Sequence, residues 1–215
     1  MIAGMRKAFA IALLALVATG ALAQEPEQQQ INVTGTAQVR IETSMGNFVV
    51  ELNAERAPQT VQNFLQYVVD GHYEGTIFHR VVGGFIAQGG GYDTSYILKP
   101  AARNVFNESG NGLSNLRGTI AMARGSEPHS ANAQFYINLV DNPSLNPRPT
   151  RWGYAVFGEV IEGMDIVDLI GAVPTGAGGE FDRDVPVTPI VINRIVLLDK
   201  EDEIKKEVAP EKEEE

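Results

Sequence analysis

Hydrophobic and polar residues alternate with a period of two over much of this chain, which is typical of β-strands with one buried face. The alternation predicts eight strands, at residues 38–43, 47–52, 77–82, 85–88, 119–123, 134–139, 154–159 and 190–198. Met45-Gly46 between the first two strands favours a hairpin. Many strands joined by loops favour a closed antiparallel barrel, because closure removes exposed sheet edges.

Two segments have helical spacing instead. In the first, apolar residues recur at i, i+3, i+4 and i+7 between Pro58, which suits a first helical turn, and Gly71, which can end a helix. These apolar residues are Val61, Phe64, Leu65 and Val68. Residues 164–170, with a glycine on either side, predict a second and shorter helix. We expect the first helix to cover an open end of the barrel.

The first 23 residues have the outline of a signal peptide. Arg6 and Lys7 precede an apolar run of about ten residues, and the chain then reaches small residues that favour cleavage after Ala23. The alternative is an uncleaved membrane anchor, but the run is shorter than the roughly 20 residues that span a bilayer. We therefore expect a protein exported to the periplasm, with no stable membrane insertion after cleavage.

The rest of the chain divides into three parts by composition. Residues 24–36 form a polar linker, residues 37–198 a single folded domain, and residues 199–215 an acidic flexible tail with nine acids against four lysines. A solvated tail is the favoured interpretation, and a partner-binding or envelope-attached tail is the alternative.

Charge and residue usage exclude several classes of function. The net charge of −10 falls to −12 when the signal peptide takes away its two basic residues, so nucleic acid and anionic lipid are not expected partners. Cysteine is absent, which excludes a disulfide framework and a thiolate nucleophile. His72, His79 and His129 are scattered, so we expect no metal site.

The strongest candidate chemistry lies in residues 78–90, Phe-His-Arg-Val-Val-Gly-Gly-Phe-Ile-Ala-Gln-Gly-Gly. Arg80 falls within a strand pattern that should be half buried, and burying a guanidinium is costly unless polar partners meet it. Gln88 in the adjoining strand is a candidate partner. The alternative is an arginine at a strand end with its head in water. His79 is predicted to be a structural, hydrogen-bonding histidine.

This stretch resembles the signature of the cyclophilin family of peptidyl-prolyl cis/trans isomerases. Other segments that resemble the family follow in order from about Val39 to Leu198, and the likeness is greatest to bacterial exported cyclophilins. They include residues 56–58, 63–64, 118–124, 134–137 and 154–158. The resemblance implies a mainly β fold, a closed eight-stranded antiparallel β-barrel capped by two α-helices, and an isomerase that needs no cofactor.

The resemblance also implies roles for single residues. Arg80 would be the catalytic hydrogen-bond donor. Gln88 and the backbone near Ala123 would hold the peptide groups next to the proline. The remaining residues implied to bind substrate are Phe85, Ile86, Tyr136, Leu145 and Tyr154.

Two positions depart from the family pattern. Tyr136 replaces the usual Phe, and its hydroxyl would either narrow the pocket or find a partner at the rim. Ser144 replaces an aromatic residue, which predicts weak cyclosporin binding. Trp152, the only tryptophan, is predicted to pack its loop.

The function predicted from the sequence is isomerisation of X-Pro bonds in unfolded or flexible exported polypeptides, by a monomer that assists their folding. The alternative is a chaperone or scaffold module that binds proline-containing segments with little turnover. The presence of both Arg80 and Gln88 favours the enzyme.

Overall fold

The computed structural model describes residues 33–198. The predicted signal peptide, most of the linker and the acidic tail lie outside these residues. Nine strands form one sheet: β1 (Thr36–Thr43), β2 (Gly46–Asn53), β3 (Thr76–Ile77), β4 (Arg80–Val82), β5 (Ile86–Gly89), β6 (Thr119–Met122), β7 (Phe135–Asn138), β8 (Val156–Glu162) and β11 (Val191–Leu198). A separate hairpin consists of β9 (Thr175–Gly178) and β10 (Phe181–Pro186).

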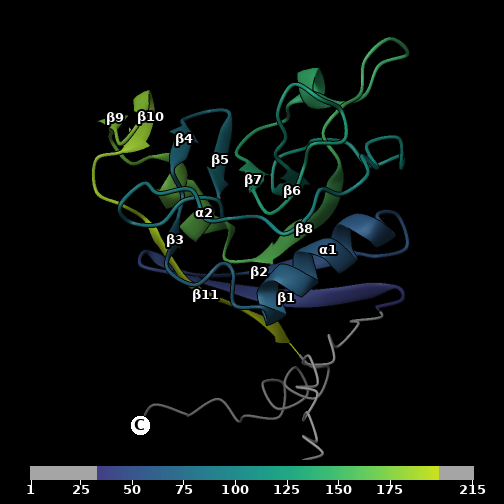
Figure 1. The fold of residues 1–215 in the computed structure, drawn as a ribbon, viewed down its shortest axis with the longest axis horizontal. Helices are drawn as coiled ribbons and strands as arrows, with labels where there is room; N and C mark the ends of the chain where they lie inside the picture. Colours follow the sequence, from purple (N-terminus) through teal and green to yellow (C-terminus); the bar gives the residue numbers. More distant parts are fainter. Residues whose placement is uncertain (1–32, 199–215) are drawn as a thin grey trace, which may run out of the picture.

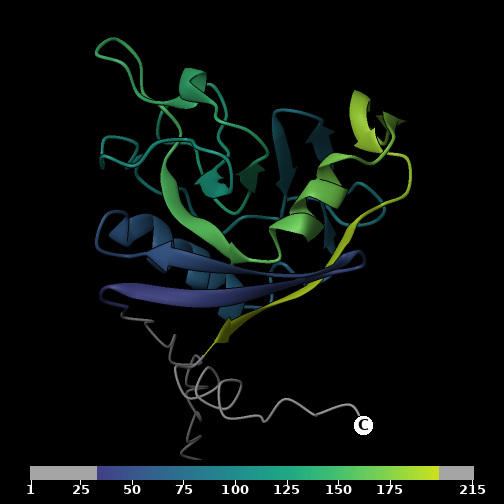
Figure 2. The same ribbon diagram turned by 180° about the vertical axis from the view of Figure 1, so that it is seen from behind.

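The large sheet is an open half-barrel, and the expectation of a closed eight-stranded barrel is wrong. Its strand order is β3-β11-β1-β2-β8-β6-β7-β5-β4, so β3 and β4 are the two edges (Figures 1 and 2). The predicted strand at residues 77–82 is divided between these edges. Phe78 and His79 are both buried, and the Phe78 N–H donates to the Ile190 carbonyl, so the chain leaves one edge of the sheet before it begins the other.

Two helices flank the sheet, α1 (Pro58–Val69) and α2 (Met164–Gly171), close to the ranges that the apolar spacing predicts. Helix α1 has Pro58 in its first turn, but Ala57 before it provides no capping side chain. The Glu108 carboxylate supplies the cap instead, by accepting the Gln59 and Thr60 N–H groups at 3.2 and 2.8 Å. None of the helices within residues 33–198 is long and apolar enough to cross a membrane.

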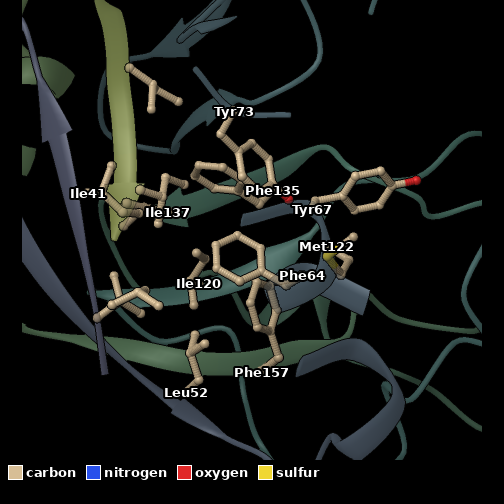
Figure 3. Close-up of a cluster of buried hydrophobic side chains, with 14 of the residues drawn as sticks. Ile41, Leu52, Phe64, Tyr67, Tyr73, Ile120, Met122, Phe135, Ile137 and Phe157 are labelled. Carbon is tan, nitrogen blue, oxygen red and sulfur yellow. The ribbon is translucent and has the colours of Figure 1, made fainter. Parts of the chain in front are cut away.

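The core lies between α1 and the inner face of the half-barrel. Phe64 of α1 is fully buried, and its ring centroid is 5.2 Å from those of Tyr73 and Phe157 and 5.7 Å from that of Phe135. Figure 3 shows Phe64 in the middle of these rings, beside the side chain of Ile120 and above that of Leu52. The predicted apolar face of the first helix is therefore what anchors it to the sheet.

The β9–β10 hairpin is not predicted by the sequence pattern. Residues 176–179, Gly-Ala-Gly-Gly, have too few side chains to indicate a strand, and they suggest turns instead. The register between the two strands shifts between Phe181 and Val185, where residues 182–184 of β10 face a single residue of β9, an irregularity of the β-bulge kind that is called the bulge below. The hairpin lies beside the β4 edge of the sheet (Figure 1).

Candidate active site

The strands β4, β5, β7 and β6 present different side chains on their two faces. One row of paired residues, Val81, Ala87, Ile137 and Ile120, is buried in the core. The adjacent row, Arg80, Gln88, Tyr136 and Ala121, lies on the opposite face because side chains alternate along a strand. The core pattern thus dictates that the candidate site lies on the outer face of the half-barrel.

A cavity of about 270 Å³ opens on this outer face. All eight residues that the resemblance singled out line it, together with one residue that it did not. The lining residues are Arg80, Phe85, Ile86, Gln88, Ala123, Arg124, Tyr136, Leu145 and Tyr154. They come from several strands, the adjoining loops and the 3₁₀ turn η1 (Pro143–Leu145), so only the folded sheet brings them together.

Arg80 is held at one side of the cavity by polar partners. Its Nη1 donates to Gln88 Oε1 at 3.5 Å, and Gln88 Nε2 donates to Gln134 Oε1 at 3.0 Å. The Arg80 side chain is 37% exposed, and its Nε lies 3.8 Å from Asp184 Oδ2. The guanidinium therefore combines the two arrangements that the sequence left open: it has polar partners, and it also keeps contact with water.

Glycine is required at one position behind this chain of amides. A Cβ on Gly91 would lie 2.5 Å from Gln134 Cδ, well inside van der Waals contact. The absence of a side chain at Gly91 therefore gives Gln134 the space from which it holds Gln88.

The other side of the cavity is apolar. Ile86, Ala123 and Tyr136 are buried and pack with two further buried residues beneath the cavity, whereas Phe85, Leu145 and Tyr154 are partly exposed around it. The rings of Tyr136 and Tyr154 meet edge to face, with their centroids 5.9 Å apart. This combination of a cation and an apolar wall is suited to a ligand with an apolar ring next to a polar group.

The Tyr136 hydroxyl has a partner in the interior and not at the rim. It donates to Asn115 Oδ1 at 2.7 Å, and Asn115 is fully buried. Burial raises the pKa of Tyr136, so the phenol stays protonated and keeps this bond over the physiological pH range. The Tyr136 ring therefore lines the cavity, while its hydroxyl is hydrogen-bonded in the interior beneath the cavity.

Arg124 was not predicted as a site residue, although it directly follows Ala123. Its guanidinium lies 4.6 Å from the centroid of the Tyr154 ring and donates to the carbonyls of Trp152 and Gly153 at 3.0 and 3.3 Å. These bonds fix the loop that carries Tyr154. The only indication in the sequence was that Arg124 follows Ala123, whose backbone was expected to contact substrate.

The histidines and Trp152 lie away from the cavity. His79 is buried against the rings of Tyr92 and Phe181, and its Nδ1 has no hydrogen-bond partner within residues 33–198. Burial, aided slightly by the neighbouring Arg80 cation, lowers the pKa of His79 to about 4. Trp152 packs edge-on against His129. Among the described residues, no group of three acidic or histidine side chains could hold a metal ion.

Comparison with known proteins gives one consistent family. Residues 38–196 match the family described as cyclophilin type peptidyl-prolyl cis-trans isomerase/CLD. The chain is 51% identical over 163 residues to a peptidyl-prolyl cis-trans isomerase of Streptomyces antibioticus, covering 74% of this chain and 98% of that protein. It is 46% identical over 162 residues to peptidyl-prolyl cis-trans isomerase B of Escherichia coli, with the same coverage of both.

A solved structure agrees with these relatives. The cyclophilin type peptidyl-prolyl cis-trans isomerase of Cryptosporidium parvum, crystallised in the presence of the dipeptide Ala-Pro, superposes with a TM-score of 0.62 at 29% sequence identity. The match covers 76% of this chain and 99% of that one.

Proposed function

Because the chain belongs to the family of cyclophilin-type peptidyl-prolyl cis-trans isomerases, we propose that the cavity beside Arg80 is where it isomerises X-Pro bonds, and that its substrates are exported polypeptides. The isomerase activity itself follows from the family and from 46–51% identity to such enzymes over most of the chain. The observation that carries the assignment of the site is the meeting of Arg80, Gln88 and an apolar wall around one cavity.

The reaction needs neither a nucleophile nor a metal ion. Its barrier of about 18–20 kcal/mol comes from resonance between the carbonyl and the imide nitrogen. In the twisted transition state this resonance is lost, the nitrogen becomes pyramidal and its lone pair can accept a hydrogen bond. A catalyst has to provide a donor for that nitrogen and a surface that holds the ring.

Arg80 is suited to the role of the donor. Its guanidinium is always charged, and its link to Gln88 limits the directions in which it can point. A bond to the imide nitrogen forms only when the lone pair is released, so it stabilises the transition state more than the planar ground state.

The apolar wall is suited to the proline ring. Ile86, Tyr136 and Leu145 would hold the ring, with Phe85 and Tyr154 at its edges. Gln88 and the backbone at Ala123 would bind the peptide groups on either side. With the ring held, the carbonyl side of the bond rotates.

Export is the second part of the proposal, and it rests on residues 1–23. A periplasmic isomerase would speed the slow folding step of exported chains, since uncatalysed isomerisation takes tens of seconds or more. Fractionation of cells that express the full chain tests this: the soluble periplasmic protein should begin at Gln24. Full-length protein that stays with membranes after a high-salt wash would support an anchor instead.

Further details of binding belong to the same proposal. We expect a monomer, and we expect weak binding of cyclosporin because Ser144 offers no ring. The competing proposal is a binding module that holds proline-containing segments with little turnover. The presence of the Ala-Pro dipeptide with the Cryptosporidium parvum protein fits either role.

One experiment separates enzyme from binder and tests Arg80. The cis-to-trans rate of a short X-Pro peptide is measured with residues 24–215 and with Arg80→Ala, after circular dichroism shows that both are folded. Removal of one transition-state donor should lower kcat/KM by about 10²–10³-fold. Arg103→Ala, which removes an exposed arginine outside the cavity, should keep the wild-type rate.

Two results would contradict the proposal. A rate for Arg80→Ala close to that of the wild type would exclude Arg80 as the donor. Folded wild-type protein that binds proline peptides without accelerating their isomerisation would favour the binding module.

A further inference from the structure

We propose that Asp184 is a positioning residue for Arg80: its carboxylate holds the Nε side of the guanidinium, while Gln88 holds the opposite side. The inference rests on the proposed role of Arg80 as the donor. Nothing in the sequence pattern singles out Asp184, which lies more than one hundred residues from Arg80 in the chain.

The Arg80 guanidinium has a polar partner on each of two sides. Asp184 Oδ2 lies 3.8 Å from Arg80 Nε, and Arg80 Nη1 donates to Gln88 Oε1 at 3.5 Å. The Asp184 side chain is 25% exposed, so water screens the pair only in part. Of the five N–H groups of a guanidinium, these contacts leave most free for a substrate.

The backbone at Asp184 supports a functional placement. Its φ of 66° lies in the left-handed region, which only Tyr96 and Asp184 among the non-glycine residues of the described chain adopt. Aspartate tolerates this region better than most residues, but the conformation still has a cost. The residue also lies within the bulge of β10, and bulges commonly redirect a side chain next to an active site.

The hairpin that carries Asp184 is anchored on both sides of the bulge. Phe181 packs against the rings of His79 and Tyr92, with centroids 5.6 and 5.1 Å apart. Val185 is buried. Because His79 directly precedes Arg80, the hairpin and the strand that bears the guanidinium are packed as one unit, and the carboxylate has a fixed position relative to β4.

A second arginine shares the Asp184 carboxylate. Arg183 Nε lies 3.7 Å from the same Oδ2 atom, but its side chain is 86% exposed and does not line the cavity. Asp184 thus shares its charge with a solvated group, and what it contributes to Arg80 is direction.

Asp184→Gly is the sharpest test, because glycine adopts a positive φ without strain and so keeps the bulge while the carboxylate is removed. We expect kcat for an X-Pro peptide to fall by about threefold to tenfold with KM unchanged, as a misdirected donor would cause. In an NMR spectrum, the side-chain Nε–H signal of Arg80 should shift and exchange faster with water. Asp184→Asn, which keeps an acceptor at the same place, should restore part of kcat.

The matched control is Asp182→Gly, two residues away on the same strand and exposed. It removes the same charge and loosens the same hairpin, and it should leave kcat and the Arg80 signal unchanged. Combining Asp184→Gly with Arg80→Ala should lower the rate no further than Arg80→Ala alone.

The outcomes separate this inference from the proposed function. Wild-type kcat in Asp184→Gly, together with a large loss in Arg80→Ala, overturns the positioning role and leaves the proposed function intact. An equal loss in Asp182→Gly, or an additive loss in the double variant, shows a general effect of the hairpin and also overturns it. A wild-type rate in Arg80→Ala overturns both.

Discussion

Replacing Tyr136 with phenylalanine removes one hydroxyl from beneath the candidate cavity and leaves the ring in place. The hydroxyl donates to Asn115 Oδ1 at 2.7 Å, and that oxygen also accepts from Asn138 Nδ2 at 3.2 Å. The variant therefore loses one buried hydrogen bond but leaves no acceptor unsatisfied, which should cost about 1 kcal/mol of unfolding free energy. For a domain of this size, the melting temperature should fall by about 2–4 °C.

Catalysis should change little, because the hydroxyl does not face the cavity. We expect kcat/KM of Tyr136→Phe to stay within about twofold of the wild type, since only a lost contact to the reacting groups would lower it strongly. The measurements are urea unfolding and the cis-to-trans rate of an X-Pro peptide. Tyr154→Phe is the control, because the Tyr154 hydroxyl has no hydrogen bond within residues 33–198 and phenylalanine keeps the ring beneath Arg124, so its stability should equal that of the wild type.

Either of two results would refute this reasoning. A tenfold change in kcat/KM with unchanged stability would mean that the hydroxyl contacts substrate. An unfolding free energy equal to that of the wild type would mean that the bond to Asn115 contributes nothing.

Two further predictions concern the surroundings of the site. His79 has a folded-state pKa of about 4, below its unfolded value of 6.5, so the unfolded chain binds a proton first as the pH falls. As the pH falls from 6.5 to 4, the wild type should therefore lose up to about 3 kcal/mol of unfolding free energy. His79→Phe cannot titrate at this position, so its unfolding free energy, measured with urea, should fall by about 3 kcal/mol less over the same pH range. Equal losses in the two proteins would contradict the lowered pKa. Gly91→Ala should displace Gln134, release Gln88 and lower kcat/KM by about threefold to tenfold. Gly110→Ala, where a new Cβ meets no atom within 4 Å, should be neutral, and a neutral Gly91→Ala would contradict the role of the Gln134–Gln88 bond.

The parts of the fold that were predictable are those where side chains carry a period. Val61, Phe64 and Leu65 predicted the buried face of α1, and that face is in the core. The pairing of Arg80 with Gln88 follows from two adjacent strands joined by a tight Gly-Gly turn. Here the local pattern and the final structure agree because few other arrangements would bury the same apolar residues.

Closure of the sheet was not predictable from the same pattern. The period-two signal at residues 77–82 is continuous, but Phe78 and His79 both become buried through contacts with residues distant in sequence. The β9–β10 hairpin was missed because glycine has no side chain and so cannot contribute to an alternation of apolar and polar residues. In both cases, tertiary contacts decide what local alternation leaves open.

The candidate site could be assembled only through resemblance. Phe85, Ile86 and Leu145 look like ordinary apolar residues, and spacing alone gives no reason to bring them to one cavity. Arg124 and Asp184 were missed because charged residues are usually solvated. Their contacts depend on the placement of whole segments, which no periodicity encodes.

The short edge strand that carries Arg80 has a consequence for how the protein releases its substrates. Unfolded polypeptides present free backbone N–H and C=O groups, and an exposed sheet edge would recruit them as an additional strand. Strand β4 has only three residues, and the β9–β10 hairpin lies beside it (Figure 1). The short, flanked strand therefore leaves little free sheet edge beside the proposed site, which favours release of a bound polypeptide over its retention as an added strand.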